Sequence, residues 1–294
     1  MHDRVSEIAS DHVTLDSGTQ LAADYIVVAT GSAYAAPFKP AGDSIEDFRT
    51  AHTAIGQQIA NARSIAIVGA GAVGTDLAGE IAAARPDKKV TLISAVDRLF
   101  PMYPRKLGQQ LLRKLTRMGV EVILGQRVKN LQWLDAPYEG PVTLSNGQVI
   151  DAELVVPVIG SRPNMSLLES LPGVQITTSK RVKTDAWMRP SSLPNVLVAG
   201  DIAEVGDGMT IVAITRQAPW LIKTLKEVLH GAKLEDQKPY TPWKKAPILL
   251  PLGPQIGASW IFATFGNRVT RLMKGKDLFI PKYRKAFGLA DGTK

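Results

Sequence analysis

An internal repeat constrains this 294-residue chain more than any other feature. The segment VTLDSGTQLAADYIVVATGS begins at Val13, and the segment VTLSNGQVIDAELVVPVIGS begins at Val142. They align without a gap and are identical at 8 of 20 positions, namely Val13, Thr14, Leu15, Gly18, Ala23, Val27, Gly31 and Ser32. A self-match of this kind indicates a chain built from two related units.

A glycine-rich loop accompanies the second copy. The apolar run Ile65–Val68 is typical of a buried strand, and Gly69, Gly71 and Gly74 follow it at the start of a predicted helix. In that context G-x-G-x-x-G is the dinucleotide-binding fingerprint, although a plain glycine turn is the alternative. The first glycine permits the turn, the second lets a pyrophosphate approach the backbone, and the third lets helix and strand pack closely. The helix N-terminus offers N–H donors to phosphates.

No equivalent loop accompanies the first copy. The copies are 129 residues apart, from Val13 to Val142, so the loop expected for the first copy would fall before Met1. We therefore expect a chain that begins inside its first nucleotide-binding unit, as a truncated gene model, an isoform or a fragment does.

The internal repeat, with the strand and helix patterns around it, predicts an α/β fold with two Rossmann-like dinucleotide-binding domains, the first incomplete at the N-terminus, plus a small C-terminal region. We expect a remnant of the first domain over 1–50, the second domain over 51–162, the return of the first over 163–235, and the C-terminal region over 236–294. A helix is predicted over Met209–His230. In the helix after the glycine loop, one face is predicted to carry the apolar residues Val73, Leu77, Ile81 and Ala84.

The end of the strand after that helix bears on nucleotide choice. An acidic residue there would bind the ribose 2′-hydroxyl of NAD, but the chain has Ser94. Arg98, four residues on, is positioned to meet a 2′-phosphate, or is an ordinary surface residue. We expect NADPH to be accepted, with NADH as the alternative.

The absence of cysteine excludes structural disulfides, thiolate metal sites and catalytic redox thiols. The four histidines are scattered singly, so no metal site is predicted; they are His2, His12, His52 and His230. No nucleophile and general base are spaced in the sequence in a way that indicates a catalytic pair.

The net charge of +8, from 35 basic and 27 acidic residues, is concentrated near the C-terminus. From Ser259 onward, apolar residues such as Trp260 and Phe262 alternate with lysine and arginine. A solubilising surface packed on the protein, a face for an anionic membrane and a face for nucleic acid are all compatible with this pattern.

Three motifs together carry a family resemblance. The order Ala29-Thr30-Gly31, GAGAVG and VLVAGD (196–201) resembles the two-domain flavoproteins of the pyridine nucleotide-disulphide oxidoreductase family. The tail GPQIGASWIFATFGNRVTRLMKGKDLF, which starts at Gly253, is similar to the apoptosis-inducing-factor-like, ferroptosis suppressor protein branch. The resemblance covers nearly the whole chain.

The resemblance implies the cofactors FAD and NAD(P)H and assigns residues to them. Asp201, beside Gly200, would bind the FAD ribityl chain. The adenine and pyrophosphate side of FAD would be lined by Val5, Ala29, Thr30 and Gly31, and Gly160 is a further cofactor-binding residue. Asp76 stands where relatives have a glutamate near flavin and nicotinamide, so it is the catalytic candidate, with a helix-surface aspartate as the alternative. With the first glycine loop missing, we expect the chain alone to retain little FAD.

The predicted function is an FAD-dependent oxidoreductase. Without a thiol pair, hydride from NAD(P)H would pass through the flavin directly to a small-molecule acceptor of quinone type, with dioxygen as a leak. The alternatives are a non-catalytic NAD(P)-binding or nucleic-acid-binding protein of the apoptosis-inducing-factor kind, and an inactive truncated copy. The expected location is cytoplasmic or peripheral on a membrane.

Overall fold

The chain folds as two units, each assembled from two separate segments. The computed structural model describes residues 2–34, 38–39, 44–169, 171–190 and 193–289. Unit 1 comprises Met1–Ala33 and Ser161–Ala246, and unit 2 comprises Tyr34–Gly160 and Pro247–Lys294. The predicted α/β class is confirmed, while the divisions at 50, 162 and 235 differ from these boundaries.

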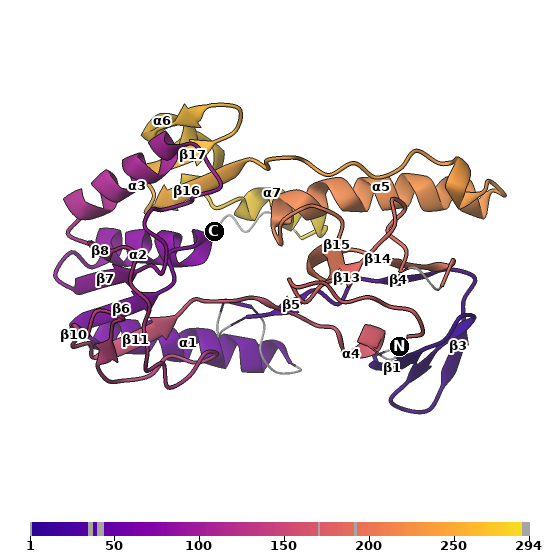
Figure 1. Cartoon of the computed structure of the whole chain (residues 1–294), viewed down its shortest axis with the longest axis horizontal. Helices are drawn as coiled ribbons and strands as arrows, with labels where there is room; N and C mark the ends of the chain where they lie inside the picture. Colours follow the sequence, from indigo (N-terminus) through magenta and orange to yellow (C-terminus); the bar gives the residue numbers. More distant parts are fainter. Residues whose placement is uncertain (1, 35–37, 40–43, 170, 191–192, 290–294) are drawn as a thin grey trace. The chain divides into compact units, whose positions relative to one another are not determined.

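A four-stranded parallel sheet forms the centre of unit 2. Its strands follow the order β11, β6, β7 and β8 and span Leu154–Pro157, Ser64–Val68, Lys89–Ile93 and Glu121–Ile123. Helices α2 (Ala72–Ala84) and α3 (Arg105–Arg117) make the crossovers from β6 to β7 and from β7 to β8. The two helices lie beside the sheet in Figure 1. Parallel strands joined by helices are buried on both faces, which explains the unbroken apolar runs in the sequence.

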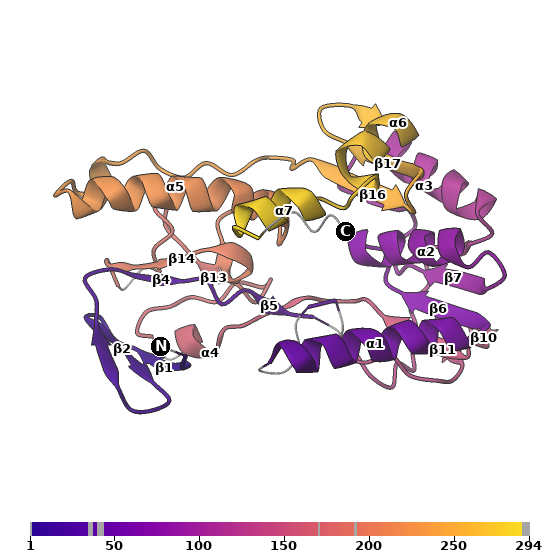
Figure 2. The ribbon, with the colours of Figure 1, turned by 180° about the vertical axis from the view of Figure 1, so that it is seen from behind.

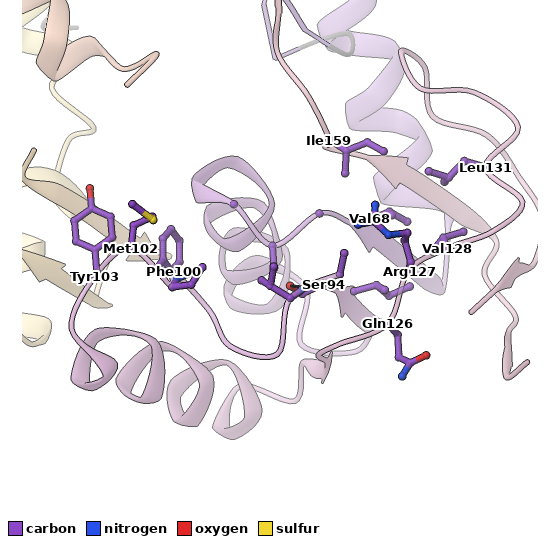
Figure 3. Close-up of a pocket in the computed structure, with 17 residues that line it drawn as sticks. Val68, Ser94, Phe100, Met102, Tyr103, Gln126, Arg127, Val128, Leu131 and Ile159 are labelled. Atoms are coloured by element: carbon purple, nitrogen blue, oxygen red, sulfur yellow. Dashed lines mark hydrogen bonds between the residues drawn. The ribbon is translucent and has the colours of Figure 1, made fainter. Parts of the chain in front are cut away.

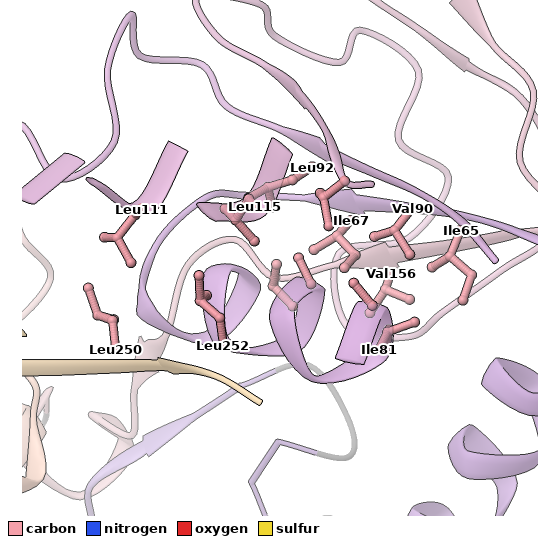
Figure 4. Packing of buried hydrophobic residues seen from close by; sticks show 14 of the residues in the cluster. Ile65, Ile67, Ile81, Val90, Leu92, Leu111, Leu115, Val156, Leu250 and Leu252 are labelled. Carbon is pink, nitrogen blue, oxygen red and sulfur yellow. The ribbon is translucent and has the colours of Figure 1, made fainter. Parts of the chain in front are cut away.

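The two faces of this sheet have separate cores. On one face, Ile65 and Ile67 pack with Leu92 against helices α1 (Ile45–Asn61), α2 and α3, as Figure 4 shows. On the other face, Ala66 and Val68 pack on a two-stranded hairpin made by β9 and β10. That hairpin spans Val142–Thr143 and Val149–Ile150. Alternate residues of β6 therefore serve opposite cores, as strand geometry requires.

Helix α2 buries only part of the face predicted for it, since Leu77 packs against the core that contains Ile81. Ile81 is buried, but Val73 is 36% exposed and Ala84 is exposed. The buried positions are mostly small residues, namely Gly74, Thr75, Ala78, Gly79, Ile81 and Ala82. Small side chains let the helix approach its neighbours closely. This close packing, rather than the stripe of larger apolar residues, determines which face of the helix is buried.

The C-terminal region packs on α2 as part of unit 2. Strands β16, β17 and β18 form an antiparallel sheet over Ile248–Leu252, Ile256–Trp260 and Thr264–Phe265. Leu250 and Leu252 are buried in the core of unit 2. A Cβ at Gly79 of α2 would lie 2.5 Å from Leu252 Cα, so only glycine allows this approach. Figures 1 and 2 both show β16 beside α2. The predicted separate C-terminal region thus shares the core of unit 2.

Short helical segments complete the C-terminal part of unit 2. They are α6 (Asn267–Thr270), the π-helical turn η3 (Arg271–Gly275) and α7 (Ile280–Ala286). In the described part of the chain, no helix combines the length and the apolar character needed to cross a membrane.

Unit 1 begins with an antiparallel meander, visible in indigo in Figure 2. Its strands β1, β2 and β3 span Val5–Ile8, His12–Leu15 and Gln20–Ala22. Three further pairs follow: parallel β4 with β14 (Ile26–Val28, Val196–Val198), antiparallel β5 with β12 (Ser32–Ala33, Arg162–Pro163) and parallel β13 with β15 (Val182–Lys183, Ala203–Glu204).

The helices of unit 1 are mostly short. They are α4 (Ser166–Glu169), η1 (Gly200–Ile202), η2 (Leu234–Asp236) and the long α5 (Ile211–Leu229). Thr210 caps α5, because its side chain accepts a hydrogen bond from Ala213 N. The helix predicted over Met209–His230 is therefore present, within two residues at each end.

Candidate functional site

The glycine loop of unit 2 joins β6 to α2. Gly69 has φ +117°, and a Cβ there would lie 2.6 Å from the carbonyl oxygen of Val158. A Cβ at Gly74 would lie 1.9 Å from the carbonyl oxygen of Gly69. By contrast, a Cβ at Gly71 would meet no atom within 4 Å. Gly69 and Gly74 are thus required by packing, whereas Gly71 leaves open space at the N-terminus of α2. This arrangement fits a nucleotide diphosphate.

A cavity of about 460 Å³ opens at this loop. It extends across the carboxyl ends of β6 and β7 to the segment after β8, where Gln126 and Arg127 lie, as Figure 3 shows. Gly69, Gly71 and Ser94 line it, together with apolar side chains such as Phe100. Crevices at the carboxyl ends of parallel strands are where open α/β sheets bind ligands.

Two predicted nucleotide-binding residues have different places. Ser94 lines the cavity and is 3% exposed, and its Oγ accepts a hydrogen bond from Val96 N at 3.3 Å. Arg98 does not line the cavity, and its guanidinium donates a hydrogen bond to Pro101 O at 2.5 Å. Arg127 lines the cavity although the sequence did not single it out. Gly160, with φ +72°, lies outside the lining.

Asp76, on α2, forms an ion pair with Lys274 of η3. The Lys274 Nζ lies 2.8 Å from Asp76 Oδ2 and also donates to Leu249 O at 3.2 Å. Asp76 Oδ1 is buried without a hydrogen-bond partner among the described residues. Burial raises the pKa of Asp76 to about 6, while Lys274 opposes the shift and Glu80 adds slightly to it. The alternative of an ordinary surface aspartate therefore does not describe its surroundings.

The candidate FAD residues of unit 1 meet where β4 and β14 end. Because these strands are parallel, Gly31 and Gly200 follow them at the same edge, with φ +67° and +80°. Asp201 Oδ2 accepts a hydrogen bond from Ser32 Oγ at 2.6 Å. Ala29 joins Gly31, Gly200 and Asp201 in lining a mostly apolar cavity of about 540 Å³ beside α5. A carboxylate at the rim of an apolar cavity suits the hydroxyls and rings of FAD.

Two predicted FAD residues lie outside that lining. Thr30 Oγ1 donates to Asn164 O at 2.8 Å, and Asn164 Nδ2 donates back to Thr30 O at 2.9 Å. Val5 packs against the core of unit 1. The structure also reveals a residue that the sequence did not single out, the buried Gln217, whose Oε1 accepts from Gly200 N at 2.8 Å. Gln217 therefore fixes the Gly200 turn from α5.

Comparisons with known proteins match these observations. The family model described as pyridine nucleotide-disulphide oxidoreductase matches residues 2–219. Apoptosis-inducing factor homolog B of Dictyostelium discoideum is 29% identical over 309 residues, covering 95% of this chain and 78% of the relative. Human ferroptosis suppressor protein 1 is 26% identical over 286 residues, covering 93% and 74%.

The same comparisons extend to a solved structure. A ferredoxin reductase from Rhodopseudomonas palustris has the same fold, with a TM-score of 0.64 and 19% identity over 90% of this chain and 70% of the other. Together these matches confirm the predicted fold with two dinucleotide-binding domains, the apoptosis-inducing-factor-like branch, and the cofactor pair FAD and NAD(P)H.

Proposed function

We propose that this chain, which belongs to the pyridine nucleotide-disulphide oxidoreductase family, passes electrons from NAD(P)H through FAD to a quinone-like acceptor. An FAD-dependent NAD(P)H oxidoreductase is what the family establishes; the acceptor is our proposal. The observation that carries NAD(P)H binding is the cavity at the glycine loop, where Gly71 leaves space for a diphosphate. Balanced, NAD(P)H, a proton and a quinone give NAD(P)⁺ and a hydroquinone.

Each unit contributes the residues that bind one of the two cofactors. In unit 2, the backbone at Gly69 and Gly71 and the N-terminus of α2 hold the diphosphate of NAD(P)H. In unit 1, the Asp201 carboxylate accepts hydrogen bonds from the ribityl hydroxyls of FAD, and Ser32 orients that carboxylate through its 2.6 Å hydrogen bond. FAD, when bound, supplies the hydride and electron chemistry itself.

Asp76 and Lys274 form the charged pair that we assign to placing the nicotinamide. Asp76 Oδ1 is buried without a hydrogen-bond partner among the described residues, so its capacity to accept a hydrogen bond is unused in the folded chain. Because the pKa of Asp76 is raised to about 6, this carboxylate is ionised at neutral pH and protonated in mild acid.

The absence of cysteine from this sequence supports the proposal of a quinone-like acceptor. Disulfide reduction in this family requires a thiol pair, and the sequence contains no cysteine. We therefore propose that the acceptor takes electrons directly from the flavin, which suits a planar quinone.

Steady-state turnover tests the acceptor. With FAD supplied in excess, we expect the chain to oxidise NADPH in the presence of a short-chain quinone and not in the presence of a small aromatic disulfide. Asp201→Asn should weaken FAD binding about tenfold, since a hydrogen bond to a charged group contributes roughly 1.5–3 kcal/mol. Asp16→Asn, at an exposed turn of unit 1, is the matched control and should bind FAD normally. Disulfide reduction, or NADPH oxidation that quinone does not stimulate, would refute the proposal.

The basic C-terminal segment, from Ser259 onward, supports a peripheral membrane location. Leu272, Ile280 and Phe287 are 80%, 57% and 77% exposed, and Lys282 and Lys285 lie on α7 between the last two. Apolar side chains interleaved with lysines suit the surface of an anionic bilayer.

Vesicle flotation tests this location without disturbing the core. Removal of β17 would take Ala258 out of the core of unit 2, so point substitutions are preferable to a truncation. We expect the chain to float with phosphatidylserine vesicles, and Leu272→Ser with Phe287→Ser to abolish flotation. Ile45→Ser, 79% exposed on α1, is the matched control. Equal flotation of the tail variant and the control would exclude the tail as the docking face.

A further inference from the structure

Backbone hydrogen bonds join the two loops that follow β7 and β8. Ser94 N donates to Ile123 O at 2.8 Å, Gln126 N donates to Ser94 O at 2.9 Å, and Gly125 N donates to Val96 O at 2.9 Å. The segment 125–127 therefore lies directly beside 94–96. In this class of fold, the end of the second strand is where the adenosine ribose is recognised.

A second set of hydrogen bonds fixes the loop after β8 from its other side. Gln126 Oε1 accepts from Ser145 Oγ at 2.7 Å and from Asn146 N at 3.1 Å. Arg127 N donates to Ser145 Oγ at 3.2 Å. The backbone of Arg127 and the side chain of Gln126 are thus anchored to the β9–β10 turn. In Figure 3 the nitrogen atoms of Arg127 turn toward Val68, at the end of β6, while Gln126 points the other way.

Arg127 carries the positive charge of this cavity. Among the described residues that line it, Arg127 is the only one with a charged side chain. No described residue forms a hydrogen bond or ion pair with its guanidinium. Asp97, in the neighbouring loop, is outside the lining. A guanidinium without a protein partner, beside a ribose position that lacks a carboxylate, suits a phosphate group, which it binds with paired N–H donors.

Arg98, the other arginine near this site, has a hydrogen-bond partner within the protein. Arg98, the sequence candidate for this role, donates to Pro101 O at 2.5 Å and does not line the cavity. Ser94 Oγ accepts a hydrogen bond from Val96 N. Because residue 94 is a serine, this position has no carboxylate to select the free 2′-hydroxyl of NADH.

We propose that Arg127 binds the 2′-phosphate of NADPH and so makes this chain prefer NADPH to NADH. The proposal rests on the proposed function to the extent that the nicotinamide nucleotide occupies the glycine-loop cavity. It identifies a specificity residue and does not depend on the electron acceptor.

Calorimetric titration of the whole chain with two adenine nucleotides tests the proposal. Adenosine 2′,5′-bisphosphate carries the 2′-phosphate, and adenosine 5′-monophosphate lacks it. Arg127→Gln should weaken binding of the bisphosphate at least about tenfold, because a charge-assisted hydrogen bond is lost. Binding of the monophosphate should change less than about twofold, because this nucleotide has no 2′-phosphate for Arg127 to bind. The substitution retains a polar side chain of similar length, on an exposed residue, so folding is expected to be unaffected.

Arg98→Gln is the matched control and should leave both affinities unchanged. Equal weakening of both nucleotides by Arg127→Gln, no weakening of the bisphosphate, or an effect confined to Arg98→Gln would overturn the assignment. If the bisphosphate preference is present but quinone turnover is absent, the acceptor proposal fails and the role of Arg127 stands. If neither nucleotide binds, both proposals fail.

Discussion

Gly71→Val is expected to weaken NADPH binding at least tenfold while leaving unit 2 folded. Gly71 has φ −73°, a conformation open to any residue, and its Cβ would meet no protein atom within 4 Å. The valine side chain would instead fill the space assigned to the diphosphate and remove its hydrogen bonds to the backbone. Each hydrogen bond to a charged group contributes about 1.5–3 kcal/mol, and 1.4 kcal/mol is tenfold in affinity. Calorimetric titration with NADPH and a thermal unfolding curve provide the two measurements.

Two further glycines separate binding from folding in this experiment. Gly74→Val should destabilise unit 2 by roughly 1–3 kcal/mol or more, because its Cβ would overlap the carbonyl oxygen of Gly69. Gly56→Val, in α1, also enters open space and should leave NADPH affinity unaltered. Normal NADPH affinity in the folded Gly71→Val variant would show that the diphosphate does not lie at this loop.

Lys274→Met is expected to lower the free energy of unfolding by about 1–3 kcal/mol at pH 8, and by less at pH 5. At pH 8 Asp76 is ionised, and removal of Lys274 leaves a largely buried carboxylate without its counter-charge. At pH 5, below the pKa of about 6, Asp76 is mostly protonated, so removal of Lys274 lowers the free energy of unfolding by less. Denaturant unfolding at both pH values gives the comparison, with Lys276→Met, an exposed position, as control. A loss equal at both pH values would contradict this account of the pair.

The same carboxyl predicts a pH slope in the unsubstituted chain. The folded pKa of about 6 lies above the ordinary aspartate pKa of 3.8, so the native state binds more protons than the unfolded state between those values. Stability contributed by Asp76 therefore falls as pH rises from about 4 to 6, by roughly 3 kcal/mol at 1.36 kcal/mol per pKa unit. Asp76→Asn removes a titrating group and should remove this part of the slope.

Local patterns predicted the centre of unit 2 well. The glycine loop, the strand before it and the helix after it depend on residues close in sequence, and the structure has all three. The internal repeat likewise led to two nucleotide-binding units. Long-range contacts could not be predicted from the sequence. Asp76 and Lys274, for example, lie 198 positions apart, and no periodicity connects them. The packing of β16 on α2 depends on Gly79, which belongs to no stripe of apolar residues.

The choice between two arginines shows the same limit within the site. Arg98 follows Ser94 closely in sequence, so it was the natural candidate for a phosphate. Arg127 reaches the same region only because β8 lies beside β7, and the loops after them exchange backbone hydrogen bonds. Strand order is a tertiary property, and a single sequence does not state it. A signal was nonetheless present, since an arginine just after the third strand of such a sheet falls at its ligand-binding edge.

The central claim is that this chain binds two nucleotides, one in each unit, and a crystal structure grown with FAD and NADPH tests it most directly. The account predicts the NADPH diphosphate against Gly71 and the N-terminus of α2, with the FAD ribityl hydroxyls on Asp201. A diphosphate bound away from the glycine loop, or an FAD sugar chain distant from Asp201, would contradict it.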